Sequence, residues 1–334
     1  MSAAVYLLGA VAIGCVPAAH LLASASWPRR SPAVAIALWQ AIGLGWGVAT
    51  VGALAGVGAA GLDGRAGIGL SSVAGAAARA ARLLLGTDSA AARRWDVLTG
   101  LRVLSLTTGI LLLTLLCWIL LAAVAAVLRA RHRQRALLGL LAHDDPKVPG
   151  ALVVDHPAAA AYCVPGLRSA IVISAGALDL LDQAELAAVL AHERAHLRAR
   201  HDLVLLPFTA LLRAFRWCAV AQEANREVAL LVEMMADDRA RRLLPARELA
   251  TALLRVGASG GGAAPTGALA IAGGPATAAS VSTGSKARLD GELAARVTRL
   301  LRPPPGLPVI AVMLLGTIAA LLVVAPAVAL LLPL

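Results

Sequence analysis

Two histidines and a glutamate with HExxH spacing are the residues of this sequence best suited to chemistry. His192, Glu193 and His196 stand in the order His-Glu-x-x-His. On a helix, residues four apart share one face, so both imidazoles can reach a single metal ion. The glutamate between them then points toward the open coordination position, where it can accept a proton from a water molecule that the metal activates. The spacing therefore predicts half of a catalytic zinc site.

The residues before this motif predict the helix that it needs. Asp182 can cap the helix start, and Glu185 three residues later can return a hydrogen bond to it, as in a capping box. Leu186, Val189 and Leu190 then supply an apolar stripe that would bury the helix. We therefore expect the motif to lie in the interior of a buried helix.

A third ligand has to come from elsewhere, and the residues just after the motif do not supply it. Metzincins continue with HxxGxxH, but Ala199 and Asp202 occupy the corresponding positions here, and His201 falls one residue out of register. His201, Arg200 and His156 could each donate to an oxyanion. For His201 we expect a solvated side chain near the helix end.

A glutamate on a second helix is the alternative third ligand. Residues 219–244 show a continuous helical pattern that contains three glutamates: Glu223, Glu227 and Glu233. We choose Glu233, because Asp237 lies four residues later on the same face and can hold the outward ring nitrogen of a ligating histidine. An ordinary charged helix, in which Glu233 pairs with Arg226 or Arg241, is the competing interpretation.

Valine- and isoleucine-rich runs ahead of the motif predict a small sheet. Three runs read as strands: 151–155, 160–164 and 168–174. An edge strand of such a sheet can hold a substrate chain extended through main-chain hydrogen bonds. Our candidate for that substrate-binding edge is Val172, Ile173 and Ser174, and a purely structural hairpin is the alternative.

The composition is typical of a membrane protein. Of the 334 residues 59% are hydrophobic, and the mean hydropathy is +0.79, which is too apolar for an ordinary soluble enzyme. No basic residue precedes the first apolar run, which argues against a cleaved signal peptide. Three or four uncharged stretches reach the roughly 20 residues that cross a bilayer: 4–25, 33–62, 103–128 and 307–332.

We therefore expect a mainly α-helical membrane protein, with an α+β zincin-like domain inserted between the third and fourth transmembrane helices. Residues 1–128 would form the membrane domain with an outer loop at 63–102, residues 129–306 the peptidase domain, and residues 307–334 the fourth helix. Small residues and proline dominate 257–284, which predicts a flexible segment. A passive tether is its default role, and a gate or a self-cleavage region are the alternatives.

The arginines predict an orientation. Arg29 and Arg30 separate the first two apolar stretches, and four arginines follow the third: Arg129, Arg131, Arg133 and Arg135. The positive-inside rule places both regions, and hence the peptidase domain, in the cytoplasm, although the 63–102 loop also carries arginines. In this interpretation the net charge of +11 sets the orientation of the chain in the membrane and favours contact with lipid head groups. We expect contact with the bilayer and no direct nucleic-acid binding.

The residues quoted above resemble one known group. ISAGAL at 173–178, AHERAHLRARHD at 191–202 and EMMAD at 233–237 are similar to BlaR/MecR-type integral-membrane zinc metallopeptidases, gluzincins related to the Ste24/HtpX-like peptidases. The resemblance implies one Zn²⁺ per chain, held by His192, His196 and Glu233. It implies Glu193 as the catalytic base and Asp237 as the acid that supports the metal ligands. It also implies a protein substrate, a winged-helix transcriptional repressor.

The chain departs from the best-known members of that group. The sequence stops at Leu334, so we expect no C-terminal penicillin-binding sensor domain, and the 63–102 loop contains no Ser-x-x-Lys motif. The expected function is regulatory proteolysis near the cytoplasmic face of a bacterial plasma membrane. A constitutive quality-control protease of the Ste24/HtpX type is the alternative, and a catalytically inactive membrane sensor or scaffold is a third interpretation.

Overall fold

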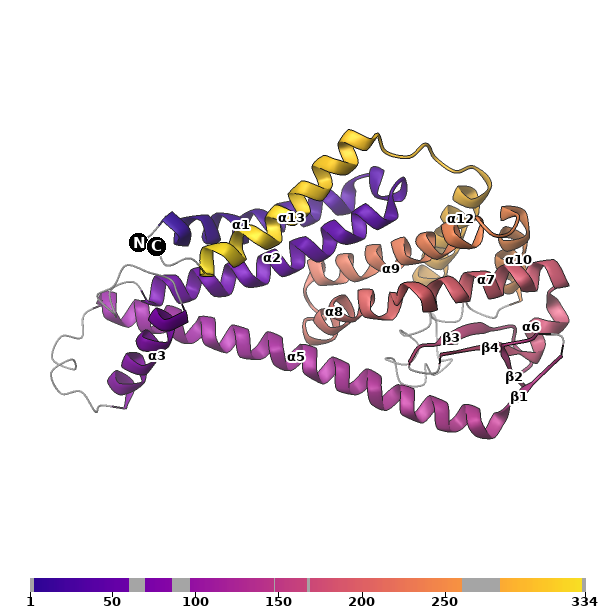
Figure 1. The fold of residues 1–334 in the computed structure, drawn as a ribbon, viewed down its shortest axis with the longest axis horizontal. Helices are drawn as coiled ribbons and strands as arrows, with labels where there is room; N and C mark the ends of the chain where they lie inside the picture. Colours follow the sequence, from indigo (N-terminus) through magenta and orange to yellow (C-terminus); the bar gives the residue numbers. More distant parts are fainter. Residues whose placement is uncertain are drawn as a thin grey trace. The chain divides into compact units, whose positions relative to one another are not determined.

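The structure is a computed structural model that is mainly helical and contains one small mixed sheet (Figure 1). It describes residues 3–59, 70–85, 97–146, 148–166, 169–259 and 283–331. The chain divides into two compact units. The first comprises Met1–Pro28, Val34–Ile119 and Leu307–Leu334, and the second comprises Arg29–Ala33 and Leu120–Gly306.

The first unit consists of apolar helices. Four helices of the chain are long and apolar enough to cross a bilayer: α1 (Ala3–Ser24), α2 (Pro32–Ala59), α5 (Val97–Leu141) and α13 (Val309–Leu331). Large apolar side chains such as Leu111, Trp118 and Ile310 lie exposed on them, as lipid-facing side chains do. These helices are consistent with a membrane protein.

Small residues let the helices of the first unit approach closely. A Cβ added at Gly45 of α2 would lie 2.6 Å from the carbonyl oxygen of Leu322 on α13. One added at Gly58 would lie 2.5 Å from the Cβ of Leu106 on α5. Such contacts replace hydrophobic burial as the source of helix association in lipid. The short helix α3 (Leu70–Leu84) packs with α2 and α5 through alanines.

The third apolar helix is much longer than predicted. We expected residues 103–128, but α5 continues through the arginine cluster to Leu141. The apolar stretch of α5 ends before the helix does. The helix continues because no proline interrupts the basic turns that follow. In the second unit, Arg131 of α5 forms an ion pair with Asp202.

The sheet of the second unit has four strands: β1 (Ala142–Asp144), β2 (Leu152–Val154), β3 (Ala161–Val164) and β4 (Ala170–Ser174). Their spatial order is β1-β2-β4-β3, with β2 parallel to β4 and the other pairs antiparallel. The three predicted strands are present, and β1 was not predicted. The prediction of Val172, Ile173 and Ser174 as an edge is wrong, because β4 lies between β2 and β3.

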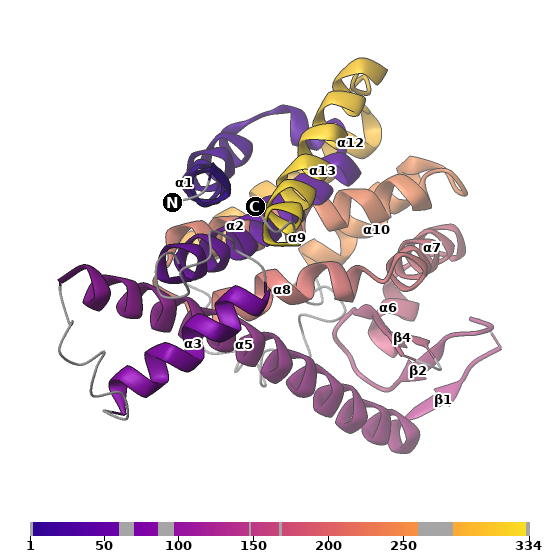
Figure 2. The same cartoon turned by 60° about the vertical axis from the view of Figure 1, so that its left-hand side comes forward.

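The helices of the second unit pack around this sheet. They are α6 (Ala175–Leu180), α7 (Gln183–Ala199), α8 (His201–Ala214), α9 (Ala219–Ala240), α10 (Ala246–Ala258) and α12 (Thr283–Leu301). Figure 2 shows α7 between the sheet and α10, and Figure 1 shows α9 running beside α7. Buried Val153, Ile171 and Ile173 meet Leu186 and Leu190 of α7 in the core.

Most of the predicted flexible segment, 257–284, lies outside the residues that the structure describes. Residues 257–259 belong to α10 or follow it directly, and α12 begins at Thr283. Residues 260–282 lie outside the described residues, so the predicted tether remains a prediction.

Candidate metal centre

The start of α7 is fixed by the predicted capping box. The Oδ1 atom of Asp182 accepts hydrogen bonds from the backbone N–H groups of Ala184 and Glu185, both at 2.9 Å. In return, Glu185 Oε2 accepts from the backbone N–H of Asp182 at 3.0 Å. Arg255 of α10 donates to the same Oε2 atom at 2.9 Å. These bonds fix the helix that carries His192 and His196 in its buried interior.

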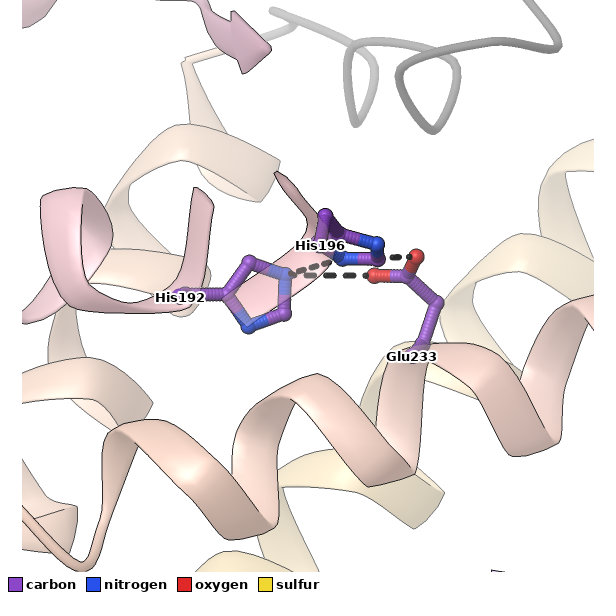
Figure 3. Close-up of side chains that lie close together, drawn as sticks. All are labelled: His192, His196 and Glu233. Atoms are coloured by element: carbon purple, nitrogen blue, oxygen red, sulfur yellow. Dashed lines mark hydrogen bonds and ion pairs between the residues drawn. The ribbon is translucent and has the colours of Figure 1, made fainter. Parts of the chain in front are cut away.

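His192 and His196 of α7 converge with Glu233 of α9. The Nε2 atoms of the two histidines lie 3.1 Å apart. Glu233 Oε2 is 3.4 Å from His192 Nε2, and Glu233 Oε1 is 3.4 Å from His196 Nε2. Figure 3 shows the carboxylate reaching from its helix toward the edges of both rings. Two helices thus bring three ligand-type atoms within 4.8 Å of one another.

The spacing of these atoms fits a zinc ion. Zinc bonds of about 2.0–2.1 Å in tetrahedral geometry place neighbouring ligand atoms about 3.3 Å apart. The two Nε2 atoms lie 3.1 Å apart, and each of them lies 3.4 Å from one of the two carboxylate oxygens of Glu233. Glu233 Oε1 is buried and has no hydrogen-bond donor among the described residues. Two imidazoles and a carboxylate are also the donor set of many catalytic zinc sites.

The competing interpretation of Glu233 as an ordinary surface acid is wrong. Arg226 lies near Glu223 and Glu227, at 3.8 and 3.5 Å. Arg241 lies near Asp238. Glu233 points away from these arginines because it occupies the face of α9 that packs on α7.

Asp237 stands behind His192, one turn along α9 from Glu233. Its Oδ1 atom lies 3.0 Å from His192 Nδ1, the ring nitrogen that faces away from Glu233. Burial alone would lower the pKa of His192, but Asp237 and Glu233 outweigh it and raise that pKa to about 10. Without a metal ion, His192 is therefore a positively charged imidazolium, with a proton on each ring nitrogen, at neutral pH. An acid in this position holds the ring orientation that metal binding requires.

Arg296 of α12 joins the two acids and was not predicted. Its Nη1 lies 3.0 Å from Glu233 Oε2, and its Nε and Nη2 donate to Asp237 at 2.9 and 2.8 Å. Burial would raise the pKa of both acids, but the guanidinium outweighs it, lowering the pKa of Glu233 to about 2 and that of Asp237 well below its usual range. Both carboxylates are therefore ionised and oriented. The sequence offered no local signal for one arginine among many.

Glu193 is buried beside His192, His196 and Glu233. Burial raises its pKa to about 7, although the neighbouring His192 acts in the opposite direction. A pKa near the working pH suits a group that must accept and then release a proton. The thiol of Cys163 on β3 hydrogen-bonds this carboxylate, and burial followed by the charge of Glu193 raises the pKa of Cys163 far above its usual value. The thiol therefore stays protonated.

The prediction of a solvated His201 is wrong. Its side chain is 1% exposed, and its Nδ1 lies 2.9 Å from Nδ1 of His196. The reason is a turn at Arg200, which has a left-handed φ of 51° and ends α7. This turn folds the first residue of α8 back against the last turn of α7. A non-glycine residue gives little sequence signal for such a conformation.

Comparison with known proteins agrees with this chemistry. Residues 113–256 match the model of Peptidase family M48. The matched segment contains all the site residues of α7 and α9 and ends before Arg296. M48 peptidases are typically zinc-dependent, so the match supports a metallopeptidase. Comparison with curated protein sequences and with solved structures gave no match.

Proposed function

We propose that this metallopeptidase-like chain is a membrane-embedded zinc endopeptidase. The observation that carries the proposal is the convergence of His192, His196 and Glu233 from two helices at zinc-ligand spacing. The M48 match over the same helices supports it independently. The four apolar helices would place the site near a membrane.

The roles of the surrounding residues follow from their positions. Zinc bound by His192, His196 and Glu233 would polarise the scissile carbonyl and activate the attacking water. Glu193 would take the proton of that water and pass it to the leaving amine. Asp237 would hold His192 in its ligating orientation, and Arg296 would keep Glu233 directed at the ion.

The open edge of β3 is the better candidate for holding substrate. Ser174 N–H donates to the carbonyl of Ala160 at 2.9 Å, so alternate residues of β3 bond to β4. By this alternation, the backbone groups of Ala161 and Cys163 point away from β4. Because β3 packs on α7 and carries Cys163 beside Glu193, an added strand here would run past the site.

The substrate class rests on the resemblance given above. We propose regulatory cleavage of a winged-helix transcriptional repressor near the cytoplasmic face of a bacterial plasma membrane. Constitutive quality control would use the same site on many membrane proteins. An inactive sensor or scaffold would hold no zinc.

Comparison of the wild type with Glu193→Gln tests these possibilities together. The variant should retain one zinc per chain and lose proteolysis, with Glu248→Gln on α10 as a control that keeps both. Quantitative proteomics of cells carrying each form then identifies the substrate. One accumulating repressor supports regulation, whereas many membrane proteins support quality control. Undiminished cleavage by Glu193→Gln, or a wild type that binds no zinc, overturns the proposal.

A further inference from the structure

We infer that His201 is a positioning residue for the proposed zinc ligand His196; the inference rests on the proposed zinc site. Each proposed histidine ligand turns one ring nitrogen toward Glu233 and the other away from it. The outward nitrogen of His192 faces Asp237 at 3.0 Å. The outward nitrogen of His196 faces the Nδ1 of His201 at 2.9 Å. The two ligands are thus supported differently, one by an anion and the other by a second imidazole.

The short distance between the two Nδ1 atoms shows that a single proton lies between them. Two nitrogens at 2.9 Å share one proton, because two facing N–H groups would repel each other. When His196 binds metal through Nε2, its own proton must sit on Nδ1. His196 then donates to Nδ1 of His201, and His201 carries its proton on Nε2. His201 Nδ1 therefore supplies the acceptor that His196 needs in the tautomer that leaves its Nε2 free for the metal.

Apart from its contact with His196, no hydrogen bond among the described residues accounts for the burial of the His201 ring. Its Nε2 atom is buried and has no hydrogen-bond partner among the described residues. Its ring meets that of His196 edge-on, with ring centroids 4.7 Å apart. A buried polar group without a second partner is unfavourable for folding. The contact with His196 is thus the polar interaction that this ring makes in the described part of the chain.

The local backbone is built to hold this contact. The left-handed turn at Arg200 places His201 at the start of α8, directly beside the last turn of α7. The next residue, Asp202, pairs with Arg131 of α5. The backbone at His201 is therefore held by this turn on one side and by the Asp202–Arg131 pair on the other.

Zinc affinity of the purified full chain tests the inference. His201→Phe keeps a planar ring but removes the acceptor, and should weaken zinc binding by about 10- to 100-fold, the usual effect of losing a partner of a ligating histidine. His201→Asn places an oxygen near the Nδ1 position and should restore most of the affinity. His201→Gln extends the oxygen past that position and should not. The dissociation constant is measured by competition with a chromophoric chelator, and thermal unfolding of the metal-free forms checks the fold.

A matched substitution separates this role from histidine loss in general. His143→Phe changes an exposed histidine on β1 and should leave zinc affinity unchanged. Equal affinity of His201→Phe and wild type overturns the inference, as does equal weakening by Asn, Gln and Phe, which indicates shape alone. If His201→Phe does not fold, the Asn and Gln variants decide in the same way. A wild type that binds no zinc removes the proposed function and the inference together, whereas zinc-loaded wild type with unaffected variants removes only the inference.

Discussion

Arg296 spans both carboxylate oxygens of Asp237, with Nε 2.9 Å from Oδ2 and Nη2 2.8 Å from Oδ1. Both side chains are buried, and 59 residues separate the two positions along the chain. The fork geometry of the guanidinium leaves its Nη1 free to reach Glu233 at 3.0 Å. One residue of α12 therefore orients both Glu233 and Asp237 of α9.

Removal of Arg296 should destabilise the metal-free protein strongly. Arg296→Met removes the guanidinium and leaves two buried carboxylates, Asp237 and Glu233, beside the single charge of His192, which should lower the free energy of unfolding by about 3–5 kcal/mol. Arg296→Lys should recover only part of this loss, because an ammonium cannot bond both oxygens in a fork. Thermal and denaturant unfolding in chelator measure the effect. Arg242→Met, which removes an exposed arginine, is the control, and equal stability of the Arg296→Met and Arg242→Met variants would contradict the prediction.

Zinc affinity should rise about tenfold for each pH unit between about pH 8 and pH 9, where Glu193 is already ionised and His192 still carries its extra proton. In the metal-free protein the pKa of His192 is about 10. That of His196 is about 4, because its burial outweighs the opposing charge of Glu233. One proton must therefore leave His192 when zinc binds, and the loss of this competition strengthens binding as pH rises. Chelator competition across this range gives the slope. A slope of zero or of two decades per pH unit would show that this proton count is wrong, and Glu193→Gln should keep the slope.

The hydrogen bond from Cys163 should set the acidic limb of the activity profile. The bond favours the ionised form of Glu193, so Cys163→Val should raise the pKa of Glu193 and move the acidic limb of kcat/KM to higher pH. Cys163→Ser retains a donor and should leave the limb near its original position. Cys218→Val, at the start of α9, is the matched control. If the acidic limb does not move in Cys163→Val, the group whose protonation causes that limb is not Glu193.

The parts of the site that the sequence predicted are those with local signals. HExxH spacing, the Asp182 capping box and the four-residue step from Glu233 to Asp237 are all set by helix geometry. Arg296 and the contact of His201 depend on chain reversals instead. The contacts of Arg296 require α12 to return across α9. The contact of His201 requires a left-handed turn at Arg200, where the sequence has neither the glycine nor the asparagine that usually marks such a turn.

The sheet shows the same distinction. Its strands were visible as valine- and isoleucine-rich runs, and the error lay in their spatial order. If consecutive strands were joined only as hairpins, β4 would lie at an edge of the sheet. The parallel pairing of β2 with β4 places β4 inside the sheet instead. Parallel pairing is a long-range choice that depends on the packing of both faces rather than on any one strand.

The open edge of β3 yields a prediction that separates substrate binding from strand stability. Ala161→Pro removes a backbone N–H that points away from β4, so it should lower kcat/KM at least about tenfold, the cost of about one well-formed main-chain hydrogen bond. The sheet should persist, because a proline is tolerated at an edge position whose N–H is outside the ladder. Tyr162→Pro removes an N–H that bonds to Val172 and should instead lower the melting temperature. Kinetics on a peptide substrate with parallel thermal unfolding measures both, and full activity of Ala161→Pro would show that substrate does not extend along β3.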